Sequence, residues 1–156
     1  MTNRFFAEEE ITDNDLYFLC YMIERLARKL HQPNCYILNK IAKDEWVRLI
    51  SLANVLHCEN ALKIEDEWID EYHLEKGDFD ITAVDPELVD EIPTATQMGK
   101  VYMRLILDTL RPNEDYVEGM LRVYNDEICK TIDNYNCSAY YEPSYVITRA
   151  YNAGGF

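Results

Sequence analysis

Apolar residues recur every three or four positions along most of the chain, and this spacing constrains its fold more than any other feature. Such spacing places apolar side chains along one face of an α-helix. Alternating runs of β-branched residues, which are typical of strands, are almost absent. The sequence therefore predicts an all-α protein, a compact bundle of about six to seven helices. The clearest predicted helix face consists of Leu16, Leu19, Cys20, Ile23, Leu26, Ala27 and Leu30.

Helix-start signals precede several of these periodic segments. Thr12-x-x-Asp15 and Thr94-x-x-Gln97 are capping boxes, in which the two side chains satisfy free backbone N–H groups at the helix start. Proline is favoured in the first turn because its missing N–H is not needed there. Further helices are predicted to begin at Asp85-Pro86, for two turns, and at Glu142-Pro143.

The break at residues 77–84 and the proline at position 93 divide the chain into two helical halves. These halves, residues 12–76 and 94–153, are possible subdomains joined by the acidic segment 77–93. In the second half, apolar residues from Val117 to Ile132 stay in helical register and predict one helix. Each half is small for a core of its own, so we expect residues 1–156 to form a single domain.

The negative charge is concentrated in one part of the chain. The net charge is −14, and residues 59–91 hold thirteen acids against Lys63 and Lys76. Nucleic-acid binding requires basic patches, and an anionic membrane surface also attracts basic segments. We therefore expect no nucleic-acid partner and no membrane partner. If charge selects a partner, that partner is a basic protein.

The cysteines and the apolar runs favour a cytoplasmic location. The five cysteines are scattered without a C-x-x-C motif, which is typical of reduced thiols in the cytosol. The first ten residues lack a basic segment followed by an apolar one, as a secretory signal would have. No apolar run approaches the roughly 20 residues that a membrane-spanning helix needs.

No catalytic or cofactor motif stands out. Asp70-x-x-His73 places a carboxylate and an imidazole on one helix face, but a di-metal bundle needs two such motifs. His57 and Cys58 do not belong to a familiar zinc pattern, and no serine lies in G-x-S-x-G. We predict no cofactor, no metal and no enzymatic activity. A metal-dependent enzyme that uses Asp70, His73 and His57 remains an alternative.

The acidic helix and the tyrosines near the C-terminus are the candidate binding surfaces. Tyrosine offers large, rigid contact area, which suits an interface. Trp68 and Tyr72 are the candidate apolar anchors, and a homo-oligomer with its seam at Tyr102 or Tyr124 stays open. The candidate partner-binding residues are Glu65, Asp66, Glu67, Trp68, Asp70, Glu71, Tyr72, Tyr140, Tyr141 and Tyr145.

Residues 14–73 carry a recognisable order of segments: "LYFLCYMIERLARKLH", "CYILNKI", "LISLANVLHCEN" and the acidic "IEDEWIDEY". This order resembles a family of small, uncharacterised bacterial helical proteins encoded beside putative toxins of ADP-ribosyltransferase type. Val55-Leu56-His57 is its most distinctive piece. The resemblance implies an antitoxin-like role.

Together these observations predict a non-catalytic interaction or regulatory protein, antitoxin-like, that docks an acidic surface on a basic partner. The alternative is an inhibitor from a phage or mobile element that uses its acids to mimic nucleic acid. Charge complementarity raises association rates and selects against wrong partners. Association with the basic partner should therefore weaken as salt rises, whereas competition with DNA would distinguish the mimic.

Overall fold

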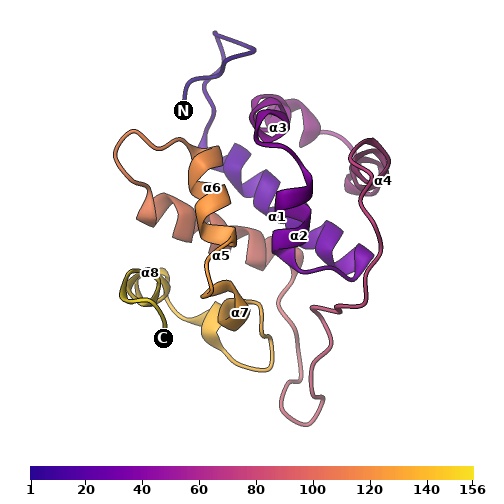
Figure 1. Cartoon of the computed structure of the whole chain (residues 1–156), viewed down its shortest axis with the longest axis vertical. Helices are drawn as coiled ribbons and strands as arrows, with labels where there is room; N and C mark the ends of the chain where they lie inside the picture. Colours follow the sequence, from indigo (N-terminus) through magenta and orange to yellow (C-terminus); the bar gives the residue numbers. More distant parts are fainter.

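The computed structural model describes residues 1–156 as eight α-helices and one short 3₁₀-helix, with no β-strand (Figure 1). The predicted all-α class and single compact domain are confirmed. The helices are α1 Asp13–Leu30, α2 Asn34–Lys40, α3 Lys43–Leu56, α4 Ala61–Glu71, α5 Ala95–Thr109, α6 Tyr116–Tyr124, α7 Cys129–Ile132, the 3₁₀-helix η1 Ala139–Tyr141 and α8 Ser144–Ala153.

Helix α1 forms the centre of the molecule, and every residue of its predicted apolar face is buried. It packs most extensively against α5, the first helix of the second half. Gly99 on α5 permits this close approach, because a Cβ atom there would lie 3.1 Å from the backbone of Tyr21. The main helix–helix contact therefore lies between the two halves of the chain.

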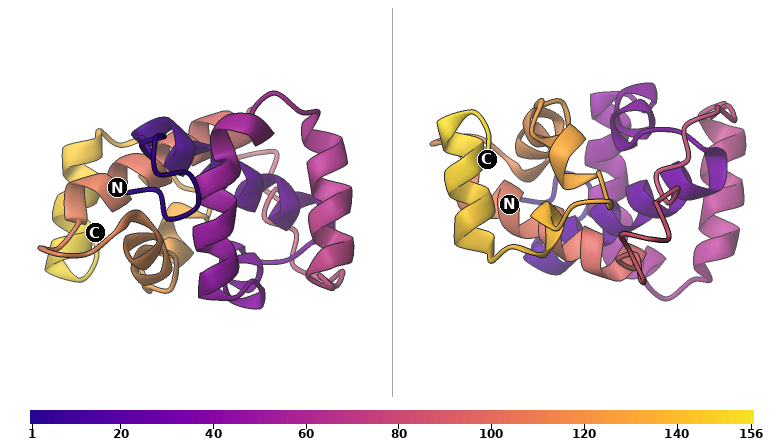
Figure 2. Two further views of the ribbon diagram at one scale, coloured as in Figure 1. Left: turned by 90° about the horizontal axis from the view of Figure 1, so that it is seen from above. Right: turned by 90° about the horizontal axis from the view of Figure 1, so that it is seen from below.

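The remaining helices surround this pair. Helices α2, α3 and α4 pack against α1, whereas α6 and α8 pack against α5. Figures 1 and 2 place α4 and α8 on opposite sides of the molecule. One continuous core of 36 buried apolar residues includes side chains from both halves.

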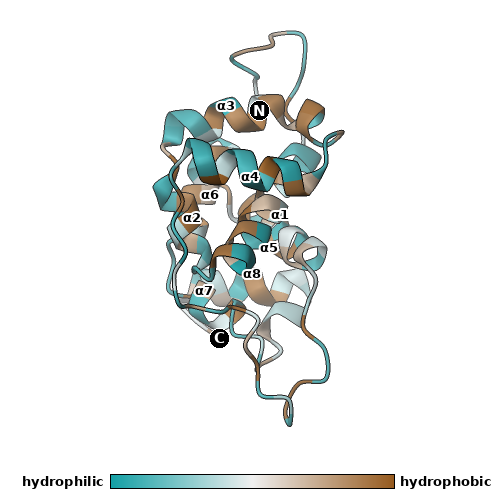
Figure 3. Cartoon of the chain, turned by 90° about the vertical axis from the view of Figure 1, so that its right-hand side faces the viewer, coloured by the Kyte–Doolittle hydropathy of each residue, from teal (hydrophilic) through white to brown (hydrophobic).

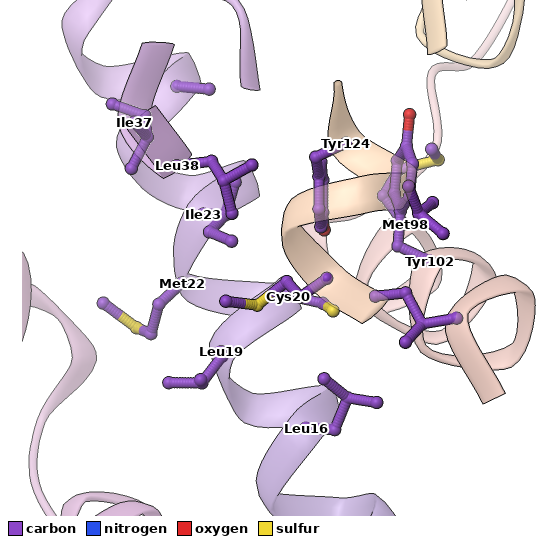
Figure 4. Close-up of a cluster of buried hydrophobic side chains, with 14 of the residues drawn as sticks. Leu16, Leu19, Cys20, Met22, Ile23, Ile37, Leu38, Met98, Tyr102 and Tyr124 are labelled. Atoms are coloured by element: carbon purple, nitrogen blue, oxygen red, sulfur yellow. The ribbon is translucent and has the colours of Figure 1, made fainter. Parts of the chain in front are cut away.

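Tyr102 and Tyr124 lie inside this core (Figure 4). Their rings stack with centroids 4.3 Å apart, and Cys20 of α1 lies close to them. Stacked aromatic rings at this distance add to the energy gained by burying them. The prediction that either tyrosine forms a seam between subunits is therefore wrong, because neither ring reaches the surface.

The structure differs from two of the predicted helices, and at both places polar side chains form hydrogen bonds with the backbone. The segment from Val117 to Ile132 is split into α6 and α7 at Asn125 and Asp126. Asn125 Nδ2 donates to the carbonyl of Leu121, and Asp126 accepts from the N–H of Ile128. Such local bonds offer the backbone an alternative to the helical ladder.

The predicted two-turn helix at Asp85-Pro86 is a single turn. The backbone N–H groups of Leu88 and Val89 both donate to the carbonyl of Asp85, and the side chain of Asp85 accepts from Glu87 N. No further turn follows. The chain then continues without a helix to Pro93, with Ile92 partly buried against the core. Helix α5 begins after the capping box of Thr94 and Gln97, which is confirmed.

None of the helices combines the length and the apolar character needed to cross a bilayer. Helix α1, the longest, carries buried Asp15 and Glu24 among its apolar residues. It spans 18 residues. A membrane span would need roughly 20 consecutive, mostly apolar residues.

Candidate functional site

Helix α4 does not present all of its acids to solvent. Glu65 and Trp68 are each only 3% exposed. The ring of Trp68 packs edge-on against Trp46 of α3, with centroids 6.0 Å apart. Both residues were candidate partner-binding residues, and this interpretation is corrected: Trp68 belongs to the core, and Glu65 lies between α4 and α1.

Basic residues of α1 explain why an acid lies in that position. Arg25 Nε is 2.5 Å from Glu65 Oε1, and Lys29 Nζ is 3.4 Å from Glu65 Oε2. A buried carboxylate is tolerated when it is paired and hydrogen-bonded in this way. Against the opposing effect of partial burial, the contact with Glu65 raises the pKa of Arg25. Contacts with Asp66 and then Glu65 raise the pKa of Lys29. Glu65 therefore attaches α4 to α1.

The exposed acids of α4 also face basic residues. Asp66 lies 2.9 Å from Lys29, Glu71 3.1 Å from Arg48, and Glu67 3.7 Å from Lys63. Asp70 is exposed and pairs with no basic side chain. Most of the charge on this helix is thus already balanced within the molecule.

Tyr72, at the end of α4, is half-buried within the same network. Its hydroxyl donates to Glu45 and accepts from Arg48 of α3. Burial raises the pKa of Tyr72 to about 12. Its hydroxyl therefore connects α4 to α3, and most of the ring is unavailable as an anchor.

The tyrosines near the C-terminus do not extend the surface of α4. Tyr141 and Tyr145 are strongly exposed, whereas Tyr140 is half-buried against Tyr135. Tyr145 belongs to α8, on the side of the molecule opposite α4 (Figure 2). The two predicted binding surfaces are therefore separate.

The segment that follows α4 carries charge that is not balanced. The acidic loop, residues 78–91, holds six acids, all exposed, and none of them forms an ion pair: Asp78, Asp80, Asp85, Glu87, Asp90 and Glu91. It also exposes two large apolar side chains, Phe79 and Leu88, the latter 72% exposed. Figures 1 and 3 show this segment projecting below the helical bundle.

The acidic loop is fixed to the bundle at its first part. The N–H groups of Gly77 and Phe79 donate to the carbonyls of Leu30 and His31 at the end of α1. A Cβ atom at Gly77 would lie 2.7 Å from the carbonyl oxygen of His31, so a glycine is needed there. Ile81 is buried, and Asp85 N donates to Asn136 Oδ1 at 2.7 Å. Residues 86–91 beyond this point form no hydrogen bond to the helices, and the chain meets the core again at Ile92.

A buried cluster of polar side chains lies near this loop, and sequence patterns did not predict it. Glu24 of α1 accepts hydrogen bonds from Arg28, from Tyr135 and from Nδ2 of Asn34. Asn34 Nδ2 also donates to Asp133, at 3.2 Å. No local motif signals this cluster, because its members lie up to 111 residues apart.

The carboxyl group of Asp133 has a different pKa from an ordinary exposed aspartate. Burial and the nearby negative charge of Glu24 raise its pKa to about 8. Hydrogen bonds from Tyr102 and Asn34 favour the ionised carboxylate and partly oppose this rise. Perturbed carboxyl groups in hollows of the surface are often functional.

The histidines are not gathered into a metal site. The ring of His57 packs on Phe18 with centroids 4.4 Å apart, and His73 lies just beyond α4 with a left-handed backbone. Asp70 lies within α4. No three His, Cys, Asp or Glu side chains lie close enough together to hold a metal ion.

No known relative assigns a function to this arrangement. No family model matches the chain. No curated protein and no solved structure matches it either. The contacts within the chain are therefore the basis for any functional conclusion.

Proposed function

We propose that the protein is a non-catalytic, antitoxin-like regulator that binds a basic partner protein through the acidic loop. The observation that supports this proposal most directly is the difference between the two acidic segments. The acids of α4 are mostly paired, whereas the six acids of residues 78–91 are exposed and unpaired.

Leu88 supplies an apolar contact at the centre of these charges. It is flanked by Asp85, Glu87, Asp90 and Glu91, and no helix covers it. Buried apolar anchors dominate the affinity of most interfaces, whereas charges at the rim act mainly on association rate and selectivity. An apolar hollow ringed by Lys and Arg would complement this loop.

The proposal is tested first with the proteins encoded on either side of the gene. Each is co-expressed with the chain, and co-purification and rescue of growth are measured. The loop variant Asp85→Asn/Glu87→Gln/Asp90→Asn/Glu91→Gln should weaken complex formation at least about tenfold, as should Leu88→Ser. Binding of the unaltered chain should also weaken as salt rises.

A matched control removes the same number of charges elsewhere on the surface, by Glu8→Gln/Glu10→Gln/Asp44→Asn/Glu142→Gln. This variant should bind as the unaltered chain does. Equal binding by the loop variant and the control would contradict the proposal. If the partner binds DNA and DNA displaces the chain, the result favours the nucleic-acid mimic instead.

A further inference from the structure

A pocket of about 670 Å³ lies between the acidic loop, the start of α2 and the segment around α7. Its size is that of a site for a small organic molecule. Apolar side chains of Phe79, Ile81 and Tyr135 line part of it. Backbone hydrogen bonds at Phe79 and Asp85 fix the loop on either side of Ile81, so the pocket is preformed.

Among the ionisable side chains that line the pocket, carboxyl groups outnumber the single cation. Asp80, Asp126, Glu127 and Asp133 contribute carboxyl groups, and the lone Lys130 is paired with Glu127 at 2.8 Å. An acidic lining favours a cation and disfavours an anion. Apolar walls beside it favour a ligand that also has an apolar body.

Asn34 is an independent observation that points to a ligand. The residue is 2% exposed and lines the pocket, yet its Oδ1 atom has no hydrogen-bond partner. Its orientation is fixed, because Nδ2 donates to both Glu24 and Asp133, and a flipped amide would turn its oxygen toward two carboxyl groups. A buried acceptor without a partner costs free energy, which an N–H donor from a ligand would recover.

Asp133 lies next to this acceptor and can receive the same ligand. Each carboxylate oxygen accepts about two hydrogen bonds, and Tyr102 and Asn34 donate one to each. Both oxygens therefore keep acceptor capacity. An amidinium or ammonium group offers several N–H donors and a positive charge to such a pair of neighbouring acceptors.

We propose that this pocket binds a small organic cation, with an apolar body against Phe79, Ile81 and Tyr135 and an N–H-rich head at Asn34 and Asp133. This site is separate from the exposed tip around Leu88. It therefore does not depend on the proposed partner binding, and the two proposals are tested by different variants.

Benzamidine is a suitable probe, because it joins a flat apolar ring to a cationic amidine. Benzamide and benzoate keep the ring and replace the head by a neutral and an anionic group. Each is titrated at pH 8.5 into ¹⁵N-labelled protein, and amide shifts are recorded by NMR. We expect benzamidine to shift the signals of residues 34–35, 79–83 and 124–136, with a Kd of roughly 10 mM or lower.

Benzamide should bind at least about tenfold more weakly, because it lacks the charge that strengthens hydrogen bonds to a carboxylate, and benzoate should not bind. Asp133→Asn should weaken benzamidine about tenfold and leave benzamide unchanged. Asp44→Asn, on α3 away from the pocket, is the matched control and should bind as the unaltered protein does.

Absence of shifts around the pocket, or equal binding of benzamidine and benzoate, would overturn the proposal. If Asp133→Asn does not fold, the pocket variant Asp80→Asn/Asp126→Asn replaces it. That variant should weaken benzamidine several-fold through the loss of two nearby negative charges. Unchanged binding by this variant would also overturn the proposal.

Discussion

The hydroxyl of Tyr135 lies 2.9 Å from Oε1 of Glu24, a residue 111 positions earlier in the chain. This hydrogen bond joins the loop after α7 to the central helix α1. Both residues are buried, at 2% and 1% exposure. Glu24 therefore holds the C-terminal part of the chain against α1, in addition to its pair with Arg28.

Replacement of Tyr135 by Phe should reduce the free energy of unfolding by about 1–3 kcal/mol, because a buried carboxylate loses one of its donors. Urea denaturation followed by circular dichroism measures this change. Tyr141→Phe, at an exposed position, should change stability by less than about 0.5 kcal/mol. If Tyr135→Phe lowered the free energy of unfolding no more than Tyr141→Phe does, the prediction would be wrong.

The raised pKa of Asp133 predicts a loss of stability as pH rises. Its carboxyl has a pKa of roughly 4 in the unfolded chain and about 8 in the native protein. Between these values the native state binds more protons than the unfolded state. The free energy of unfolding should therefore fall by up to roughly 1.4 kcal/mol per pH unit in that window.

Denaturation curves at pH 5 and pH 8 measure this dependence, and Asp133→Asn should reduce the difference between them. The groups that influence the titration of Asp133 are Glu24 on α1, Tyr102 on α5 and Asn34 on α2. Tyr124 on α6, Cys129 on α7 and Tyr135 also face Asp133, and its negative charge contributes to their raised pKa values. NMR of the Asp133 carboxyl carbon gives its midpoint directly. A midpoint near 4 would contradict the prediction.

Trp68 should act on folding rather than on binding. Trp68→Ala removes a buried ring that contacts Trp46, and core changes of this size cost about 3–5 kcal/mol. Thermal unfolding should show a much lower midpoint. Asp70→Asn, on the exposed face of the same helix, should leave the midpoint within a few degrees; a comparable loss in that variant would contradict this assignment.

Three of the five cysteines should differ clearly in their reactivity. Burial raises the pKa of the Cys20 thiol to about 12 and that of Cys129 still further, whereas Cys58 is exposed. Thiolates are the reactive form, so a disulfide reagent at pH 8 should modify Cys58 quickly in the native protein. Cys20 and Cys129 should react after unfolding in urea, and mass spectrometry of peptides identifies each site.

The helices could be predicted where the signal is local. The apolar face of α1 and the capping box at Thr94 and Gln97 depend on residues within a few positions of each other. The inward position of Glu65 could not be predicted in this way. Its partners Arg25 and Lys29 lie 40 and 36 residues away, and α4 by itself carries acids on several faces.

The buried polar cluster could not be predicted either, because some of its members are still further apart in the sequence. Glu24 and Asn34 are ten residues apart, and Asp133 follows Asn34 by 99 residues. No spacing rule connects them, because their contact depends on how α1, α2 and the end of α7 pack. The charge of residues 59–91 was visible in the sequence, but which acids are paired follows from the fold.

The tip of the acidic loop is a place where the backbone could be cut between two points that the bundle holds. Arg28 holds the carbonyl of Pro93 beyond the tip, as Asn136 holds Asp85 before it. A cut after Leu88 would leave fragments 1–88 and 89–156, each with one member of the α1–α5 pair and its share of the common core. In mechanical terms the loop is the single covalent link between two pieces that the shared core holds together.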